Sequence, residues 1–425
     1  MTSVLSPFIY GRSLSPAEFA GRRVELNRVA SRLSTGQSIA VIGQPHIGKT
    51  SLLEFISDAS ARRKQFEGRF ESNFFVFLDV LAAHGIRMQA DFWKYVLAPL
   101  RNSEYAAQYE YASQDGYTNF ALEQVFDNLE RGERKLILML DEFDSLLSHP
   151  VLNNPDFYGG LRTLASRSGG FALVIAARRS LQQLNQLTQE LNPHGSPYFN
   201  VFVETQLGAL KPEALTALLD QAGDHITNTD RLYVERVSGR HPYLAQTAAA
   251  MLWDVHEDGL IGQERYKVAG HNLHRQARQH FADTWNFWSN TTRKAVTAVA
   301  LAEIPRLLSK HAFKVSELVE DLDDYSEELD MLQVSGTLAQ NEEDEWVVAQ
   351  DALLWWLADE LRRNVRDETP FGDWIRAQHM DNLLTDRDRQ RLTVAAQSVL
   401  SLVGKGATTL IETLAKGFGE AIIKK

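Results

Sequence analysis

The sequence contains no cysteine among its 425 residues. Disulfide bonds, thiolate zinc sites and thiol catalysis are therefore excluded, and a reducing compartment suits the chain. No uncharged apolar run reaches the ~18 residues of a typical transmembrane helix. The N-terminus has neither the basic nor the apolar stretch of a signal peptide. We therefore expect a cytoplasmic protein.

Basic residues are fewer than acidic ones: the chain has 44 lysines and arginines, 55 acidic residues and a formal net charge of −11. A protein that coats nucleic acid must neutralise phosphates, so this balance argues against that class, although it leaves room for one local basic patch. The length exceeds one typical core. We expect several domains.

The strongest motif is a glycine loop between an apolar run (residues 38–42) and a helical segment that continues to residue 56. It consists of Gly43, Gln44, Pro45, His46, Ile47, Gly48, Lys49, Thr50 and Ser51. Strand, glycine loop and helix together are the context of a phosphate-binding P-loop, whose backbone N–H groups and helix N-terminus attract phosphate oxygens. Lys49 is expected on the β- and γ-phosphates and Thr50 on Mg²⁺. The alternative is a glycine-rich turn with an accidental lysine.

A second apolar run, residues 136–140, ends in Asp141 and Glu142. Such a strand in an open α/β sheet places both carboxylates at the edge where ligands bind. We expect Asp141 to complete the Mg²⁺ shell and Glu142 to polarise the attacking water as general base. Asp144 is expected to cap a helix. A buried strand that ends in a solvated acidic turn is the alternative.

A third buried strand, residues 171–177, ends in Arg178. A basic side chain at that edge can sense the γ-phosphate, and Arg178 is the candidate, with a structural salt bridge as the alternative. Arg162 and Arg167 lie on the preceding helical stretch and are candidates for a finger into a neighbouring subunit. Upstream, the turn at Gly21 and Arg22 is expected to line the base pocket together with Gly11.

With these residues in place, the chain resembles the STAND branch of AAA+-type P-loop ATPases, related to archaeal ATPases and to Orc/Cdc6. The resemblance also covers Ser238–Tyr243, which is similar to the Gly-x-Pro element of STAND lids but has two residues between Gly239 and Pro242. It implies that Pro242 touches the base and holds the lid closed on ADP. The implied fold is an α/β P-loop parallel sheet with helices on both faces, then a helical lid, a winged helix-turn-helix and a helical tail.

The corresponding boundaries are a nucleotide-binding domain over residues 1–205, a helical lid over 206–285, a winged helix-turn-helix over 286–365 and an amphipathic C-terminal tail over 366–425. The winged unit invites a DNA-binding interpretation. However, the stretch between Glu317 and Glu345 is rich in acids and has neither lysine nor arginine, whereas a duplex binder must neutralise phosphates. We expect a packing and relay domain that does not bind nucleic acid.

The last 35 residues, 391–425, combine an apolar stripe with lysines. Such a segment can contact a membrane interface or associate with other copies. The alternative is that the stripe packs back on the body of the protein or on another subunit. The long repeats that commonly follow the winged unit in STAND proteins are missing, since no period of 20–50 residues is visible.

These features predict a slowly hydrolysing ATPase that uses ATP/ADP and Mg²⁺ as a signalling switch. Exchange of ADP for ATP would open the chain and drive homo-oligomerisation, in bacterial immunity or regulated cell death. The tail would be the effector or the oligomer contact, and it would associate with a membrane on activation. An unidentified partner protein is a candidate for the trigger. The rivals are a DNA-associated AAA+ loader or transcription regulator and a nucleotide-bound scaffold without turnover.

Overall fold

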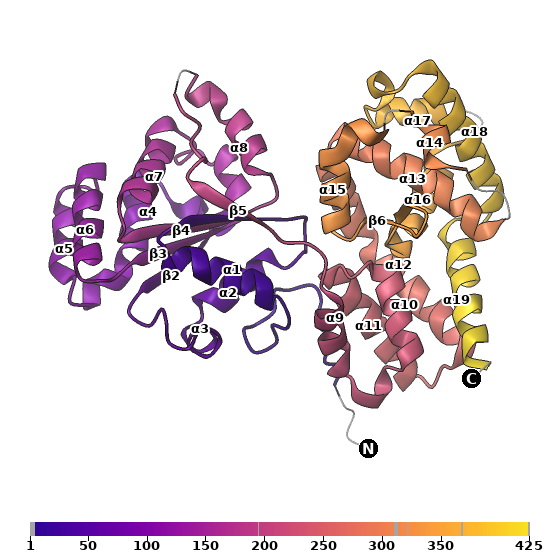
Figure 1. Cartoon of the computed structure of the whole chain (residues 1–425), viewed down its shortest axis with the longest axis horizontal. Helices are drawn as coiled ribbons and strands as arrows, with labels where there is room; N and C mark the ends of the chain where they lie inside the picture. Colours follow the sequence, from indigo (N-terminus) through magenta and orange to yellow (C-terminus); the bar gives the residue numbers. More distant parts are fainter. Residues whose placement is uncertain (1–4, 194, 310–312, 321, 367–368, 424–425) are drawn as a thin grey trace. The chain divides into compact units, whose positions relative to one another are not determined.

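The computed structural model describes residues 5–193, 195–309, 313–320, 322–366 and 369–423. The chain divides into two compact units (Figure 1). We call the first the sheet unit; it comprises Ser13–Gln44 and Gly48–Leu207. The second, the helical unit, comprises Met1–Arg12, Pro45–Ile47 and Gly208–Lys425. The chain therefore leaves the sheet unit for three residues in the middle of the glycine loop.

Five parallel strands form the sheet, in the order β2-β3-β4-β1-β5. Their bounds are β1 Ser38–Ile42, β2 Phe74–Asp79, β3 Leu136–Asp141, β4 Phe171–Ala177 and β5 Phe202–Gln206. Every residue of β1, β3 and β4 is buried. Continuous apolar strands are expected where helices cover both faces of a parallel sheet. The predicted P-loop sheet is confirmed.

Helices pack on both faces of this sheet (Figure 1). One face is covered by α1 (Arg23–Ser34) and α2 (Lys49–Ser57), which α3 (Ala59–Phe66) follows. Alternate residues of β3 and β4 point to the other face and join one apolar cluster with the helices there. Those helices include α4 Gln89–Val96, α5 Ala106–Gln114, α6 Asn119–Arg131, α7 Pro155–Arg167 and α8 Leu181–Leu187.

The helical unit begins with a bundle that surrounds α11 (Pro242–Glu257) and the long helix α12 (Gly262–Phe287). Helices α9 (Pro212–Asp220) and α10 (Asn228–Ser238) precede them. The N-terminal segment belongs to this bundle: the Phe8 ring lies 6.4 Å from that of Trp253, and the Ile9 amide donates to Gln246 at 3.1 Å.

The elements that follow include three helices, an antiparallel strand pair and a further helix, in the region where the sequence predicts a winged unit. They are α13 Asn290–Leu308, α14 Val315–Leu318, α15 Ser326–Val334, β6 Leu338–Gln340, β7 Trp346–Val348 and α16 Asp351–Asn364. This region meets the bundle backbone to backbone at Gly239 and Gly336. A Cβ built on either glycine would lie 2.2 Å from the carbonyl oxygen of the other, so neither position accepts a side chain without movement.

The C-terminal region consists of α17 (Phe371–Ala377), α18 (Asp386–Leu402) and α19 (Ala407–Ile423). The apolar stripe of α19 packs chiefly on α12 and α16, with Leu410, Ile411 and Ala415 buried. In this structure the stripe is thus covered by the body of the protein. Among the described residues, no single helix is long and apolar enough to cross a membrane; α18 and Ala407–Glu420 meet those criteria only as a pair bent by 67°.

Candidate functional site

Strand order brings the sequence-predicted residues of the sheet unit to one edge. Strand β4 lies between β1 and β3. The residues that follow β4 therefore come between the glycine loop, which follows β1, and the acids that end β3. This edge is the carboxyl end of parallel strands, where open α/β sheets bind ligands.

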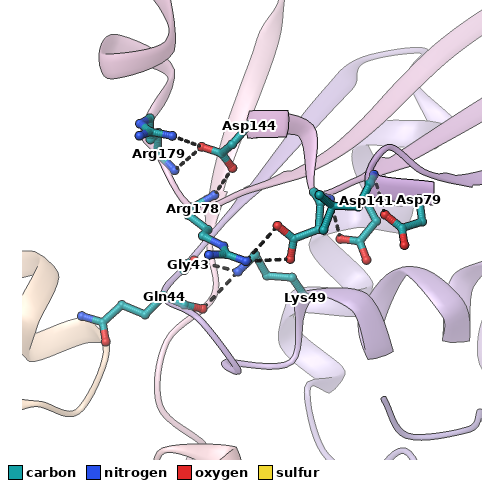
Figure 2. Close-up of polar contacts among 10 residues, drawn as sticks. Gly43, Gln44, Lys49, Asp79, Asp141, Asp144, Arg178 and Arg179 are labelled. Atoms are coloured by element: carbon teal, nitrogen blue, oxygen red, sulfur yellow. Dashed lines mark hydrogen bonds and ion pairs between the residues drawn. The ribbon is translucent and has the colours of Figure 1, made fainter. Parts of the chain in front are cut away.

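Lys49 is the first residue of α2, and its side chain turns back into the loop (Figure 2). Its Nζ donates to the carbonyl oxygens of Gly43 at 2.9 Å and Gln44 at 3.0 Å. Burial lowers the pKa of Lys49 to about 8; Glu142 opposes this shift and Arg178 adds to it. A buried ammonium without a bonded anion is costly, so the position favours an incoming negative group.

Gly48 has a φ of +98°, a left-handed backbone that glycine adopts readily. Nothing lies within 4 Å of the place where its Cβ would be. The backbone at this point of the loop is therefore open to a close approach. Backbone N–H groups beside a buried lysine at a helix N-terminus are what binds a phosphate group.

Two hard oxygen donors meet beside the lysine. Asp141 ends β3, and Thr50 follows Lys49 at the start of α2. Burial raises the pKa of Asp141, and the nearby Thr50 hydroxyl opposes that shift. Mg²⁺ prefers oxygen ligands of this kind and commonly binds through a carboxylate, waters and substrate phosphates. These two residues fit the predicted metal role in a nucleotide complex.

Glu142 and Arg178 form an ion pair at this edge (Figure 2). Arg178 Nη2 lies 3.2 Å from Oε1 and 3.0 Å from Oε2 of Glu142. The Glu142 backbone is left-handed, with φ 49° and ψ 44°, which costs roughly 1–2 kcal/mol for a non-glycine residue. Backbone strain of this kind concentrates at functional sites. The structure brings together the general base and the phosphate sensor that the sequence predicts separately.

Asp144 holds Arg178 in place instead of capping a helix, so the capping prediction was wrong. Its carboxylate accepts the backbone N–H of Arg178 at 2.7 Å and that of Arg179 at 3.2 Å (Figure 2). The short helix Phe143–Ser148 begins beside Glu142 without a side-chain cap. Two backbone donors at the end of β4 attract the carboxylate more effectively than the helix start does.

The remaining predicted residues are distributed over both units. Arg22 is buried in the sheet unit and paired with Glu25 at 3.5 Å, and Gly21 precedes it. The Ser51 hydroxyl accepts the Leu14 backbone N–H at 3.0 Å, which ties the chain upstream of Gly21 to α2. Gly11, Pro45, His46, Ile47 and Pro242 belong to the helical unit, where Pro242 is the first residue of α11. There the His46 ring lies 5.1 Å from that of Tyr243.

A model of the family Novel STAND NTPase 2 matches residues 34–303. This match covers more than half of the chain and includes the glycine loop and the acids at the end of β3. The chain belongs to this family. No match is found among curated proteins.

Solved structures similar to this STAND NTPase are distant in sequence. The Walker-type ATPase of Pyrococcus abyssi is 10% identical, with a TM-score of 0.50 over 83% of this chain and 99% of the other. The ORC2 protein of Aeropyrum pernix in ADPNP–ADP complexes is 18% identical, with a TM-score of 0.45 over 81% and 95%. A STAND protein of Pyrococcus horikoshii with a tetratricopeptide repeat sensor is 14% identical, with a TM-score of 0.37 over 99% and 59%. At these identities the likeness concerns the fold alone.

Sequence reasoning missed one acid at the site of this STAND NTPase. Asp79 ends β2 and is in register with Asp141 on the neighbouring strand. Figure 2 shows the two carboxylates side by side. The signal was present, because residues 74–79 repeat the pattern of an apolar strand that ends in an acid. Only the pairing of β2 with β3 places that acid beside the metal-binding candidates.

Proposed function

We propose that this STAND NTPase binds ATP with Mg²⁺ and hydrolyses it slowly. The observation that carries the proposal is the joint placement of Lys49, Asp141 and the Glu142–Arg178 ion pair at one sheet edge, with Thr50 directly after Lys49 on α2. Lys49 and the loop backbone would hold the phosphates, while Thr50 and Asp141 would hold Mg²⁺. When bound, the metal supplies positive charge that neutralises the phosphate oxygens.

The ion pair suggests why turnover is slow. Arg178 contacts both oxygens of Glu142, so the carboxylate is occupied by the ion pair and is not free to orient a water. A γ-phosphate would compete with Glu142 for the same guanidinium. Hydrolysis then proceeds once Arg178 turns to the phosphate and Glu142 is free to polarise water.

The second part of the proposal is a conformational switch that the bound nucleotide controls. ADP keeps the lid and winged unit against the nucleotide domain, and exchange for ATP opens the chain and drives homo-oligomerisation. Because a ligand shifts an equilibrium only by its differential affinity for the two states, hydrolysis serves as a reset. A role in bacterial immunity or regulated cell death, with the tail as effector or oligomer contact, draws its support from the family resemblance. A partner protein remains a candidate trigger.

Two measurements on the purified chain test this function. The first identifies the nucleotide that copurifies with wild type and with Lys49→Ala; we expect ADP or ATP in the wild type only. The second compares native mass with ADP and with an unhydrolysable ATP analogue; we expect a larger assembly with the analogue.

Glu142→Gln separates binding from turnover. We expect ATP affinity to be retained and hydrolysis to fall by about 10²–10⁴-fold, the usual contribution of a general base. If neither the wild type nor the variant hydrolyses ATP, a nucleotide-bound scaffold without turnover would be supported. Absence of nucleotide binding in the wild type would overturn the proposed function.

A further inference from the structure

A partly open cavity of about 320 Å³ lies at the surface of the helical unit, against the C-terminal helix α19, and the Arg236 side chain at its rim is 47% exposed. Helices α10, α13, α16 and α19 each contribute to its wall. The lining residues are Arg236, Leu307, Asp351, Leu354, Trp355, Leu410, Thr413, Leu414, Gly417 and Phe418. None of them belongs to the nucleotide site described above. We call this space the tail cavity.

The wall of the tail cavity is mostly apolar. Leucine, tryptophan and phenylalanine side chains supply most of the surface. Outside its own helix backbone, no atom of the described residues lies within 4 Å of the place where a Cβ on Gly417 would be. A wall that is apolar except for a few convergent polar groups is the general character of small-molecule sites.

One ion pair provides the polar end. Arg236 Nε donates to Asp351 Oδ2 at 2.9 Å. Burial raises the pKa of Asp351 to about 6, although Arg236 opposes the shift. Among the residues that the structure describes, none accepts a hydrogen bond from Nη1 or Nη2 of Arg236. Because Asp351 occupies only the Nε side, the two remaining nitrogens present a planar fork, the geometry that matches a second carboxylate.

The size of the cavity indicates how much of a ligand it encloses. One water occupies ~30 Å³ of the liquid, so 320 Å³ corresponds to about ten non-hydrogen atoms. An unbranched eight-carbon carboxylate has that number.

We propose that the tail cavity binds a medium-chain carboxylate, with its head group on the Nη atoms of Arg236 and its chain between Trp355 and α19. The bound molecule touches both α16 and α19 and therefore holds the tail on the body. This regulatory consequence rests on the proposed function; binding itself does not. The cavity would then be a sensor site in a chain that lacks long sensor repeats.

Calorimetry with octanoate on the nucleotide-free full chain tests the proposal, with 1-octanol as the uncharged probe of equal chain length. We expect saturable binding of one octanoate per chain, at least tenfold tighter than octanol, since hydrogen bonds to charged groups contribute ~1.5–3 kcal/mol. Equal affinities would show partitioning into apolar surface and would overturn the carboxylate anchor. An absence of octanoate binding would overturn the proposal.

Three variants locate the binding. Gly417→Phe fills the cavity from α19 and should abolish octanoate binding, whereas Gly417→Ala points one methyl group into open space and should change it less than about threefold. Arg236→Lys keeps a positive charge beside Asp351 but loses the fork, and should weaken octanoate binding at least fivefold with little effect on octanol. Unchanged binding in Gly417→Phe would place the ligand elsewhere and overturn the proposal.

The regulatory consequence has a separate readout. Octanoate should slow proteolytic cleavage between α18 and α19 in the wild type but not in Gly417→Phe. ATP affinity is measured on the same samples. If the wild type binds octanoate but not ATP, the proposed function is refuted and the proposal for the tail cavity is not. If it binds ATP but not octanoate, only the proposal for the tail cavity is refuted.

Discussion

At the scale of single residues, we expect Lys49 to couple nucleotide binding to pH. Its pKa is lowered to about 8, first of all by burial, so the amine loses its charge as pH rises through 8. Bound phosphates would raise that pKa again, and binding then takes up a proton. We expect ATP affinity to be constant below pH 7.5 and to fall by up to tenfold per pH unit between 8 and 10. Titration calorimetry at several pH values measures this, and Lys49→Ala should bind weakly without the pH dependence.

Arg178 and Arg179 are neighbours with different partners, which makes them a matched pair. Arg178 contacts Glu142, whereas the Arg179 guanidinium contacts Asp144 at 3.4 Å. We expect Arg178→Gln to lower kcat for ATP hydrolysis by about 10²-fold, as for other single donors to a transition state. Arg179→Gln should stay within threefold of wild type in the same steady-state assay. Equal effects of the two substitutions would remove the special role of Arg178.

At the scale of elements, one carboxylate holds the start of α19. Asp359 on α16 accepts the Ala407 backbone N–H at 2.9 Å through Oδ1 and meets His274 Nε2 at 2.9 Å through Oδ2. Burial raises the pKa of Asp359, but the bonds to His274 and Ala407 outweigh burial and leave it below its ordinary value. The stabilisation is therefore present above about pH 4, near the unfolded pKa, and is lost as pH falls through the lower folded value.

Removal of this anchor should loosen the tail before the rest of the protein. We expect Asp359→Ala to cost about 1.5–3 kcal/mol of the free energy of unfolding, the usual value for hydrogen bonds to a charged group. Cleavage near Gly404 should become faster in limited proteolysis. Asp373→Ala, at the start of α17, is the control: its carboxylate pairs with Arg376 on the same helix, so cleavage near Gly404 should stay as in the wild type. An unchanged cleavage pattern in Asp359→Ala would mean that other contacts hold α19.

The backbone contact between Gly239 and Gly336 is a second test of element packing. Gly239 has a φ of +56°, and an added Cβ would lie 2.2 Å from the Gly336 carbonyl oxygen. The strain of a left-handed backbone and the overpacking together predict that Gly239→Ala lowers the free energy of unfolding by about 2–4 kcal/mol. Gly372→Ala, with nothing within 4 Å, should be neutral or slightly stabilising. Differential scanning fluorimetry of the two variants separates these outcomes.

At the scale of the whole molecule, charge governs which partners are excluded. The net charge is −11, and the region of the predicted wing is acidic. Since phosphate contacts supply most of the affinity of duplex binders, we expect no measurable binding of duplex DNA at about 150 mM salt in fluorescence anisotropy. Tight binding with a steep salt dependence would instead favour a DNA-associated ATPase.

Much of the sheet unit could be predicted from local pattern. Short stretches of sequence were enough to predict the apolar strands that end in Asp141 and Arg178 and the glycine loop that ends in Lys49. A central strand of a parallel sheet is buried along its length and polar only at its end, so its pattern can be recognised locally. The acid at position 79 ends a similar run, yet nothing local says which strand lies beside β2. Pairing between strands far apart in the chain is invisible to such patterns.

The sequence by itself determined where the candidate residues for phosphate, metal and water stand in this STAND NTPase, and at which ends of which strands. Only the tertiary structure decided which of these groups meet. The Glu142–Arg178 pair, the use of Asp144 to hold β4, and the packing of α19 on α12 each join segments distant along the chain. Periodicity reveals that a helix has an apolar face, but not what covers it, because burial depends on every other element that competes for the same surface.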